Sequence, residues 1–219
     1  MKRLTLILLC VGTLSYPVEA QDYFFGTAAY KRGDYETALQ QFLPLAKNGH
    51  AKAQFSIGLM YELGGGVPKD YAKAARWYQN SAEQGNIYAQ TNLGLLYLYG
   101  MGVAKDESRA AAWLTKAAHQ GHDEAQNKLG IMYIDGTGAP KNSLSMAYTW
   151  FSIAAASGHR RGANNRDFVA RWLTPDDWFN VEYIANRYKC IKALLKPATD
   201  TFGPNNMAAQ KPDLTCLPK

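Results

Sequence analysis

The sequence predicts an all-α protein built as a short right-handed solenoid of stacked helix-turn-helix units. Small, aromatic and glycine residues recur at a spacing of 36 through the middle of the chain, from Ala53 to Ala89 to Ala125. Each copy contains two helix-length segments joined by a glycine-rich turn. Self-similarity at this length is typical of solenoids, in which each unit buries its apolar face only against its neighbours.

The first helix of a unit is clearest over about 51–63. Three residues recur there at a spacing of four, which places them on one helix face: Ala53, Ile57 and Tyr61. Gly58 lies inside this segment, and the same glycine returns in both later copies. A glycine within a helix costs about 1 kcal/mol relative to alanine. We therefore expect the partner helix to approach closely at this glycine.

The turn and the second helix follow from glycine and capping residues. The run Gly64–Gly66 should end the first helix, because glycine adopts the left-handed conformation of helix ends. The second helix should begin near a residue that accepts hydrogen bonds from free backbone amides: Asp70, Asp106 or Asn142. Its buried face is expected to carry Ala74 and Trp77, then Ala110 and Trp113, then Trp150.

The full pattern defines three repeats, and looser copies flank them. The repeats are residues 51–86, 87–122 and 123–159, the last with a one-residue insertion in its second half. Residues 21–50 fit the same plan with a shorter turn, with Phe24, Ala28 and Tyr30 on a first helix and Ala38, Phe42 and Ala46 on a second. Residues 160–189 are expected to form a capping pair of helices with a more polar outer face, the second capped by Thr174 and opened by Pro175.

The N-terminus has the pattern of a signal peptide. Lys2 and Arg3 precede an apolar run that is too short to cross a bilayer, and Val18-Glu19-Ala20 provides a small-residue cleavage site. We expect residues 1–20 to be removed and the mature chain to be exported, to the periplasm or outside the cell. The alternative, a lipoprotein modified at Cys10, is disfavoured because Leu9 is too bulky for that site.

Charge and cysteine usage set limits on partners and on the tail. The net charge is +6, and the lysines and arginines are spread over the repeats without a run of like charge. This pattern does not predict nucleic-acid binding, which requires a clustered basic stripe. After export, two cysteines remain, Cys190 and Cys216, and a disulfide between them would hold the tail, residues 190–219. The alternative is two free thiols.

These motifs resemble the Sel1-like repeat family, a subfamily of the tetratricopeptide-like helical repeats. The resemblance covers residues 51–159 with full motifs, and 22–50 and 160–188 more loosely. It implies a non-enzymatic adaptor that holds a protein or peptide on a curved surface, and exported bacterial members are linked with the cell envelope. Some exported relatives carry a disulfide in each repeat. This chain has none there, so the properties of that branch are not transferred to it.

The resemblance also implies where a partner binds. In the parent fold the first helices line the concave surface, so first-helix positions that differ between copies are the candidates. They are Phe55, Tyr88, Thr91, Asn92, Asn127 and Lys128. The alternative is that these residues are merely solvated. The repeated tryptophans and tyrosines are expected to be core, because stacked units place the same large residues against each other.

The sequence predicts neither a metal site nor a catalytic site. His50, His122 and His159 share one register, but neighbouring helices are about 8 to 10 Å apart and zinc ligands lie about 2 Å from the metal. The glycine-rich turns follow helices, whereas a dinucleotide-binding loop follows a strand. No cofactor is expected. Besides an envelope adaptor, two functions stay open: a periplasmic regulator that inhibits a membrane sensor protein, and a peptidoglycan-associated factor.

Overall fold

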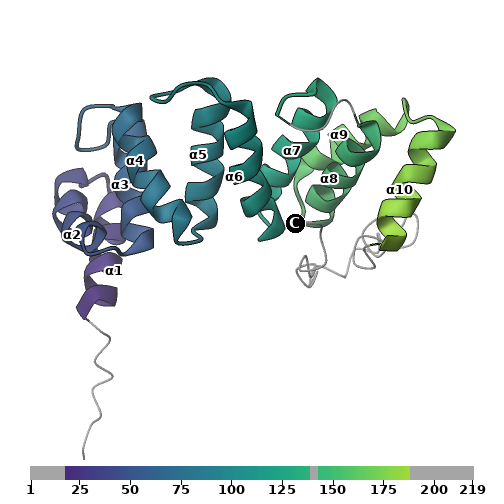
Figure 1. Cartoon of the computed structure of the whole chain (residues 1–219). Helices are drawn as coiled ribbons and strands as arrows, with labels where there is room; N and C mark the ends of the chain where they lie inside the picture. The colour runs from purple at the N-terminus through teal and green to yellow at the C-terminus, as the bar shows by residue number, and fades with distance from the viewer. Residues whose placement is uncertain (1–17, 139–142, 188–219) are drawn as a thin grey trace, which may run out of the picture.

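The computed structural model describes residues 18–138 and 143–187, and within them the chain forms helices and no strands. The helices stack side by side in chain order (Figure 1). Their bounds are α1 Val18–Lys31, α2 Tyr35–Lys47, α3 Ala51–Leu63, α4 Tyr71–Glu83, α5 Ile87–Tyr99, α6 Glu107–His119, α7 Asp123–Asp135, α8 Leu144–Ala156, α9 Arg160–Ala170 and α10 Pro175–Arg187. None of these helices is long and apolar enough to span a bilayer. The all-α solenoid is confirmed.

Each repeat is a first and a second helix joined by the predicted turn. In the first repeat, Gly64 ends α3 in the left-handed conformation, with φ 80°, and its amide donates to the Met60 carbonyl. Asp70 caps α4 by accepting a hydrogen bond from the Lys73 amide, and Asp106 caps α6 in the same way. In the third repeat the capping residue is Ser143, one position after the predicted Asn142, which lies outside the described residues.

The glycine inside each first helix is explained by close packing of the second helix. A Cβ atom added at Gly58 would lie 2.6 Å from the Tyr78 ring, and one at Gly94 would lie 2.8 Å from Leu114. Gly130 faces Phe151 in the same way. The predicted close approach is therefore confirmed within each repeat.

The main core residue of the second helix is not the repeated tryptophan but the residue after it. Tyr78, Leu114 and Phe151 are fully buried. The predicted core tryptophans Trp77 and Trp113 are only half-buried, whereas Trp150 is buried as expected. The prediction was wrong for two of the three tryptophans because the side chain that meets the glycine of the first helix takes the centre of the repeat.

A second set of glycines joins each unit to the one before it. Gly66, Gly102 and Gly138 have positive φ angles, and a Cβ atom on any of them would overlap the start of the preceding second helix, at Tyr35, Tyr71 and Glu107 respectively. The backbone of each turn therefore rests on the first turn of the previous unit.

The flanking helices differ from the predicted outer faces. In the N-terminal pair Ala38, Phe42 and Ala46 are buried as predicted, but Phe24 is 68% exposed. At the other end Thr174 caps α10 by accepting from the Asp177 amide at 3.2 Å. The expected polar outer face is wrong, because large aromatic residues are exposed there: Phe168 on α9, Trp172 in the turn after it, and Trp178, Phe179 and Tyr183 on α10.

The last two helices do not form another repeat. α10 packs against α8 rather than pairing with α9. Ser145 of α8 donates a hydrogen bond to Asp177 at 3.1 Å, and the rings of Tyr148 and Trp178 meet edge to face at 5.1 Å. α1 begins at Val18, upstream of the predicted cleavage after Ala20. Cys190 and Cys216 of the predicted disulfide lie outside the described residues.

Candidate functional site

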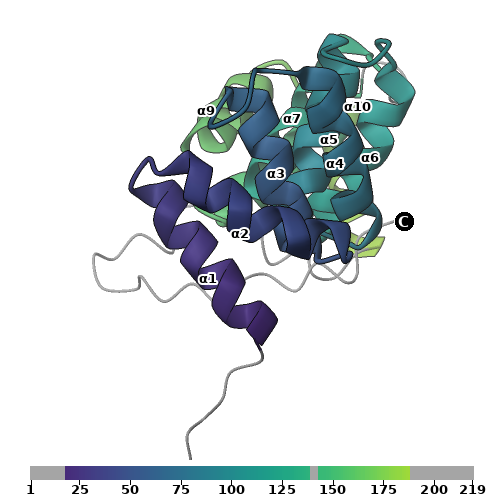
Figure 2. The ribbon, with the colours of Figure 1, turned by 90° about the vertical axis from the view of Figure 1, so that its left-hand side faces the viewer.

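The first helices α1, α3, α5, α7 and α9 form one continuous surface, which we call the inner face. Consecutive first helices touch through side chains: Phe55 meets Tyr88 at 5.8 Å between ring centroids, and Asn165 donates to Asn127 at 2.9 Å. Viewed along the stack, α3, α7 and α9 lie on one side and the second helices α4 and α6 on the other (Figure 2).

An aromatic row crosses the middle of the inner face and consists of Phe55, Tyr88 and His122. Tyr88 lies between the other two, with its ring centroid 5.8 Å from that of Phe55 and 5.4 Å from that of His122. Phe55 in turn stacks on the buried Tyr78 ring at 5.7 Å. Tyr88 is 59% exposed although it is held on both sides. It is thus a large aromatic surface in a fixed orientation.

A polar network supports the aromatic row from below. The buried Tyr78 hydroxyl donates to the Glu62 carboxylate and accepts a hydrogen bond of 3.0 Å from the Asn92 side-chain amide. Burial, followed by the adjacent Glu62, raises the pKa of Tyr78, so its hydroxyl stays protonated. Asn92 is therefore fixed in place and half-buried. Neither Glu62 nor Tyr78 was among the predicted site residues. Tyr78 lies on the second helix α4, and only first-helix positions were considered as candidates.

Two of the six predicted binding residues are buried. Thr91 is 2% exposed, with its hydroxyl donating to the Ile87 carbonyl and lying 2.9 Å from His122 Nδ1. Asn127 is 3% exposed and accepts the bond from Asn165. Their variation between copies reflects different contacts with the following unit. We therefore remove Thr91 and Asn127 from the surface available to a partner.

The inner face becomes more charged toward the C-terminal end. The predicted site residue Lys128 lies 3.6 Å from the Glu124 carboxylate, and His159 Nε2 lies 3.0 Å from the other oxygen of that carboxylate. Four predicted residues thus remain on the inner face. Three of them are connected, because Phe55 contacts Tyr88 directly, and both Phe55 and Asn92 contact Tyr78. Lys128 belongs to the separate charged group.

The histidines that share one register have structural roles. His50 and His159 cap α3 and α9, each accepting a backbone hydrogen bond through Nδ1, at 3.1 and 2.9 Å. His122 instead contacts Thr91 and Tyr88. Burial lowers the pKa of His122 despite the nearby carboxylates of Asp123 and Glu124. Within the part of the chain that the structure describes, there is no group of three or more histidine, cysteine or acidic residues that could hold a metal.

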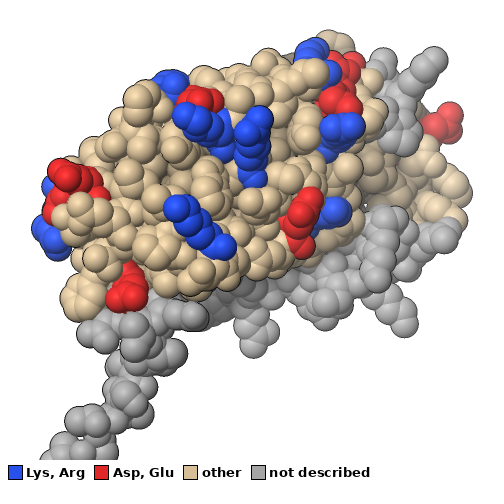
Figure 3. All heavy atoms as spheres, turned by 60° about the vertical axis from the view of Figure 1, so that its left-hand side comes forward, with Lys and Arg blue, Asp and Glu red and all other residues tan. Residues whose placement is uncertain are grey.

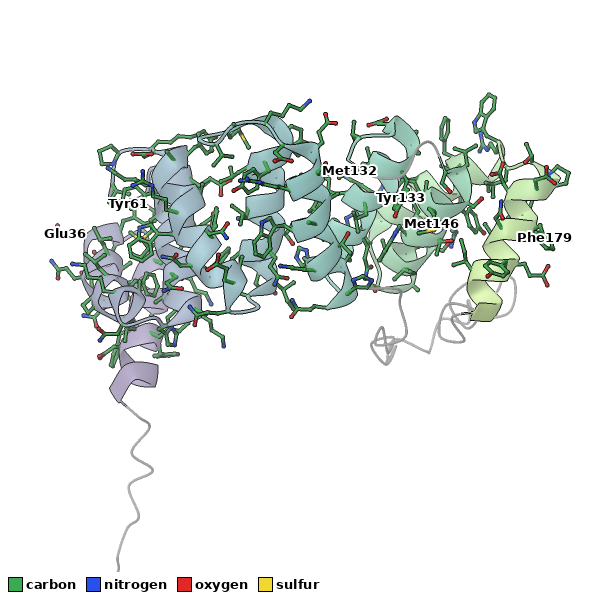
Figure 4. The ribbon with its side chains drawn as sticks, viewed as in Figure 1. Glu36, Tyr61, Met132, Tyr133, Met146 and Phe179 are labelled. Carbon is green, nitrogen blue, oxygen red and sulfur yellow. The ribbon has the colours of Figure 1, made fainter. Side chains whose placement is uncertain are left out.

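Large apolar side chains are exposed on one side of the repeats only. In the described part of the three repeats they lie on the first helices, at Leu63, Tyr88 and Tyr99, and not on α4, α6 or α8. Further ones lie at the two ends, where Phe179, for example, points away from the stack (Figure 4). On the surface shown in Figure 3, basic and acidic side chains alternate without forming a stripe. Within the described residues of the repeats, the first helices thus expose large apolar side chains, whereas the second helices do not.

The glutamine that recurs in each first helix bonds its unit to the preceding second helix, a role that the sequence pattern did not predict. Gln54, Gln90 and Gln126 each donate a hydrogen bond of 3.1 Å to a carbonyl at the end of the preceding second helix. In the first two repeats a second glutamine donates to this side chain at 2.7 Å: Gln84 to Gln54 and Gln120 to Gln90. We call these chains of two glutamines the glutamine relays.

Comparison with known proteins agrees with this geometry. A family model described as "Sel1 repeat" matches residues 51–86, 87–122 and 123–159. A solved structure of c5321, a protective antigen of uropathogenic Escherichia coli strains displaying an SLR fold, is 34% identical with a TM-score of 0.67, over 71% of this chain and 34% of that one. A Sel1 repeat protein from Oxalobacter formigenes is 35% identical with a TM-score of 0.62, over 66% of this chain and 59% of that one.

Sequence relatives match over a shorter stretch. DAP3-binding cell death enhancer 1 from Rattus norvegicus and from Mus musculus are each 44% identical to this chain over 50 residues. The match covers 23% of this chain and 10% of each relative, so the chain spans about a tenth of their length. Sel1 repeats generally mediate protein–protein interactions and typically act as scaffolds. Residues 51–159 of this protein are three Sel1 repeats, stacked as a helical solenoid.

Proposed function

We propose that this protein is a non-enzymatic adaptor of the bacterial cell envelope, and that it binds an extended segment of a partner protein on the inner face. The observation that carries the proposal is the one-sided exposure of large apolar side chains, which in the repeats lie on first helices and not on α4, α6 or α8. Exposed apolar surface of this kind marks interaction sites in soluble proteins.

Tyr88 is the expected anchor of the interaction. Its ring is exposed but held between Phe55 and His122, so it loses little conformational freedom when a partner binds. Rigid aromatic side chains commonly contribute most of the binding energy of an interface. Asn92, which its bond to Tyr78 orients, and the charged pair Lys128 and Glu124 provide polar contacts beside this anchor.

The envelope location rests on the N-terminal sequence. Lys2 and Arg3, the apolar run and the Val18-Glu19-Ala20 site are the parts of a secretory signal. Fractionation of cells that express the full chain, followed by N-terminal sequencing, should recover a periplasmic or secreted protein that begins at Gln21. A cytoplasmic protein that retains residues 1–20 would contradict this part of the proposal.

The binding face is tested by photo-crosslinking in the cell. A photoreactive phenylalanine analogue placed at position 88 should capture a partner, whereas the same analogue at Ala112, an exposed residue of α6, should not. Capture at 112 in place of 88 would overturn the assignment of the face. Recovery of a membrane sensor would identify the chain as a regulator of that sensor, and recovery of peptidoglycan would replace the protein-binding proposal.

The role of the anchor is then tested with the captured partner. Tyr88→Ala should weaken binding by about tenfold or more, the usual effect of removing an interface anchor. Phe179→Ala is the control, because Phe179 is also a large exposed aromatic residue, at 71%, but lies on α10 and points away from the stack (Figure 4). Equal losses for the two variants would show that the row has no special role.

A further inference from the structure

A small cavity opens between α1 and α3. It has a volume of about 60 Å³ and is lined by Tyr23, Thr27, Tyr30, Phe42, Ser56 and Leu59. Phe42 is buried and forms the floor, while the other five residues are half-buried and come from the two first helices. The cavity therefore lies on the inner face, and Ser56 is the sequence neighbour of Phe55 in the aromatic row.

Three of the residues that line this cavity, Phe42, Ser56 and Thr27, are smaller than their equivalents in the next gap, Tyr78, Asn92 and Leu59. Gly26 faces Phe42 as Gly58 faces Tyr78, so α1 and α2 are paired like α3 and α4. In the gap between α3 and α5 the Tyr78 hydroxyl, bonded to Glu62 and Asn92, fills the corresponding space. In the gap between α1 and α3, Phe42 has no hydroxyl, and the smaller Ser56 stands where the repeat spacing places Asn92.

The lining favours an apolar guest over water or a charged group. Thr27 donates its hydroxyl hydrogen to the Tyr23 carbonyl at 2.9 Å, and Ser56 donates to the Lys52 carbonyl at 3.0 Å. The Tyr23 hydroxyl lies 3.5 Å from the Ser56 hydroxyl. A buried water requires about three hydrogen bonds, and three of the four hydroxyls of the lining already have hydrogen-bond partners within the protein. The lining contains no carboxylate or basic group, and burial raises the pKa of Tyr30, which keeps its hydroxyl neutral.

We propose that this cavity binds one branched aliphatic side chain, of leucine, isoleucine or valine, from the bound partner segment. A volume of about 60 Å³ holds roughly four to six water-sized groups at 10 to 15 Å³ each, which leaves room for the three or four carbons of such a side chain. The inference rests on the proposed function in one respect: the aliphatic residue belongs to the segment that lies on the inner face.

The proposal is tested with a minimal probe, N-acetyl-leucine amide, in an NMR titration of the isotope-labelled full chain. Signals of Thr27, Ser56 and Leu59 should shift in a saturable manner, while N-acetyl-glycine amide should produce no saturable shift at these residues. If the glycine probe shifts the same signals equally, or if the leucine probe shifts none of them at its solubility limit, the cavity does not select an aliphatic side chain and the proposal is wrong.

Variants that close the cavity provide the control. Phe42→Tyr combined with Ser56→Asn copies the side chains of the next gap and should weaken leucine-probe binding by about tenfold or more, since apolar burial is lost. Thr27→Leu closes the cavity from the other wall, with the residue that occupies the equivalent position 59, and should have the same effect if the double variant fails to fold. Undiminished binding in a folded closing variant would overturn the proposal.

An independent variant separates the two proposals. Tyr88→Ala should leave the probe bound at the cavity, because Tyr88 is not in its lining. Failure of crosslinking at position 88 would thus refute the proposed function without affecting the probe result, and loss of probe selectivity would refute the cavity without affecting the crosslink.

Discussion

The junctions inside the repeat stack and the junction that ends it occupy equivalent positions but are made of different residues. In the first two repeats a glutamine relay joins each second helix to the first helix of its own unit and to the end of the preceding unit. In the third repeat the position of Gln84 and Gln120 is occupied by Ser157, whose hydroxyl bonds to its own helix at Ile153. Gln126 Oε1 is consequently buried without a hydrogen-bond partner.

The helix after this junction lacks the features that receive a second helix. The repeat spacing, with its one-residue insertion, places Arg166 where earlier first helices have a buried aliphatic residue and Asp167 where they have glycine. The two side chains pair with each other at 2.7 Å. A ring could not approach α9 at Asp167 as Phe151 approaches Gly130, and α10 packs against α8 instead. A few positions per unit therefore decide whether the stack continues.

The largest expected effect comes from the glycine that joins two repeats. Gly102 has φ +67°, and a Cβ atom there would overlap the backbone of Tyr71. Gly102→Ala should lower the free energy of unfolding by about 3 kcal/mol or more, because left-handed backbone strain adds to a clash that no side chain can relieve. Urea denaturation followed by circular dichroism measures this loss.

The matched control is Gly121, which has φ +88° but has no atom within 4 Å of its added Cβ. Gly121→Ala should cost only the strain of the left-handed conformation, about 1 to 2 kcal/mol. If the two variants lose the same free energy of unfolding, then Gly102 is needed only for the conformation of its own turn and not for contact between neighbouring repeats.

A smaller gain is expected from repairing the third junction. Ser157→Gln should supply the amide donor that Gln126 Oε1 lacks and raise the free energy of unfolding by about 1 kcal/mol, the usual value of one satisfied hydrogen bond. Ser157→Glu is the control, because an ionised carboxylate has similar size and cannot donate. Equal stabilities of the glutamine and glutamate variants in a urea titration would count against a relay at this position.

The smallest effect concerns pH. Burial lowers the pKa of His122 in the folded protein, so the unfolded chain, with a pKa of about 6.5, takes up its proton first as the pH falls. This contribution to stability is present above about pH 6.5 and is lost as the pH drops below it. The first repeat has Asn86 at this position, where its side chain caps α5 by accepting a 3.0 Å hydrogen bond from the Ala89 amide.

His122→Asn should therefore provide the side-chain cap that His122 does not make and flatten the pH dependence of unfolding between about pH 7.5 and 5.5. The measurement is the urea midpoint at each pH for the variant and the natural chain, which share the remaining histidines. If the urea midpoint changes with pH equally in the variant and the natural chain, His122 takes up its proton equally in the folded and unfolded states, and the prediction is wrong.

The repeated residues predicted the helices but not their tertiary partners. The spacing of Ala53, Ile57 and Tyr61 predicted a helix over 51–63, and α3 has these bounds. A Cβ atom at Gly58 would lie 2.6 Å from the Tyr78 ring, which confirms the expected close approach of the partner helix. Periodicity identifies a buried face. It did not show that Tyr78, rather than Trp77, would meet that glycine, because adjacent helix positions differ by only about 100° in direction.

The binding surface was harder to predict from the sequence, because a position can vary between copies for two reasons: it is exposed, or it contacts a different residue of the next unit. Tyr88 varies and is exposed, whereas Thr91 varies and is buried against His122 of the next unit. The two cases look alike in the repeat pattern, since the deciding contact lies 31 residues away. The polar cap predicted for the C-terminal end was wrong for a related reason: α10 leaves the register of the repeats, so its outward face could not be deduced from their spacing.

The residues of α9 also determine where the protein could grow. A duplicated copy of residues 87–122 inserted between existing repeats would meet its own preferred neighbours on both sides, with glycines and glutamines already in place. A copy added after α9 would meet Arg166 and Asp167, and α9 lacks the glycine that a closely packed helix requires at this position. Lengthening is therefore confined to the interior of the stack. Each inserted unit would add one first helix and extend the inner face by about one helix spacing, roughly 8 to 10 Å, while the α1 cavity and the α10 end move apart unchanged.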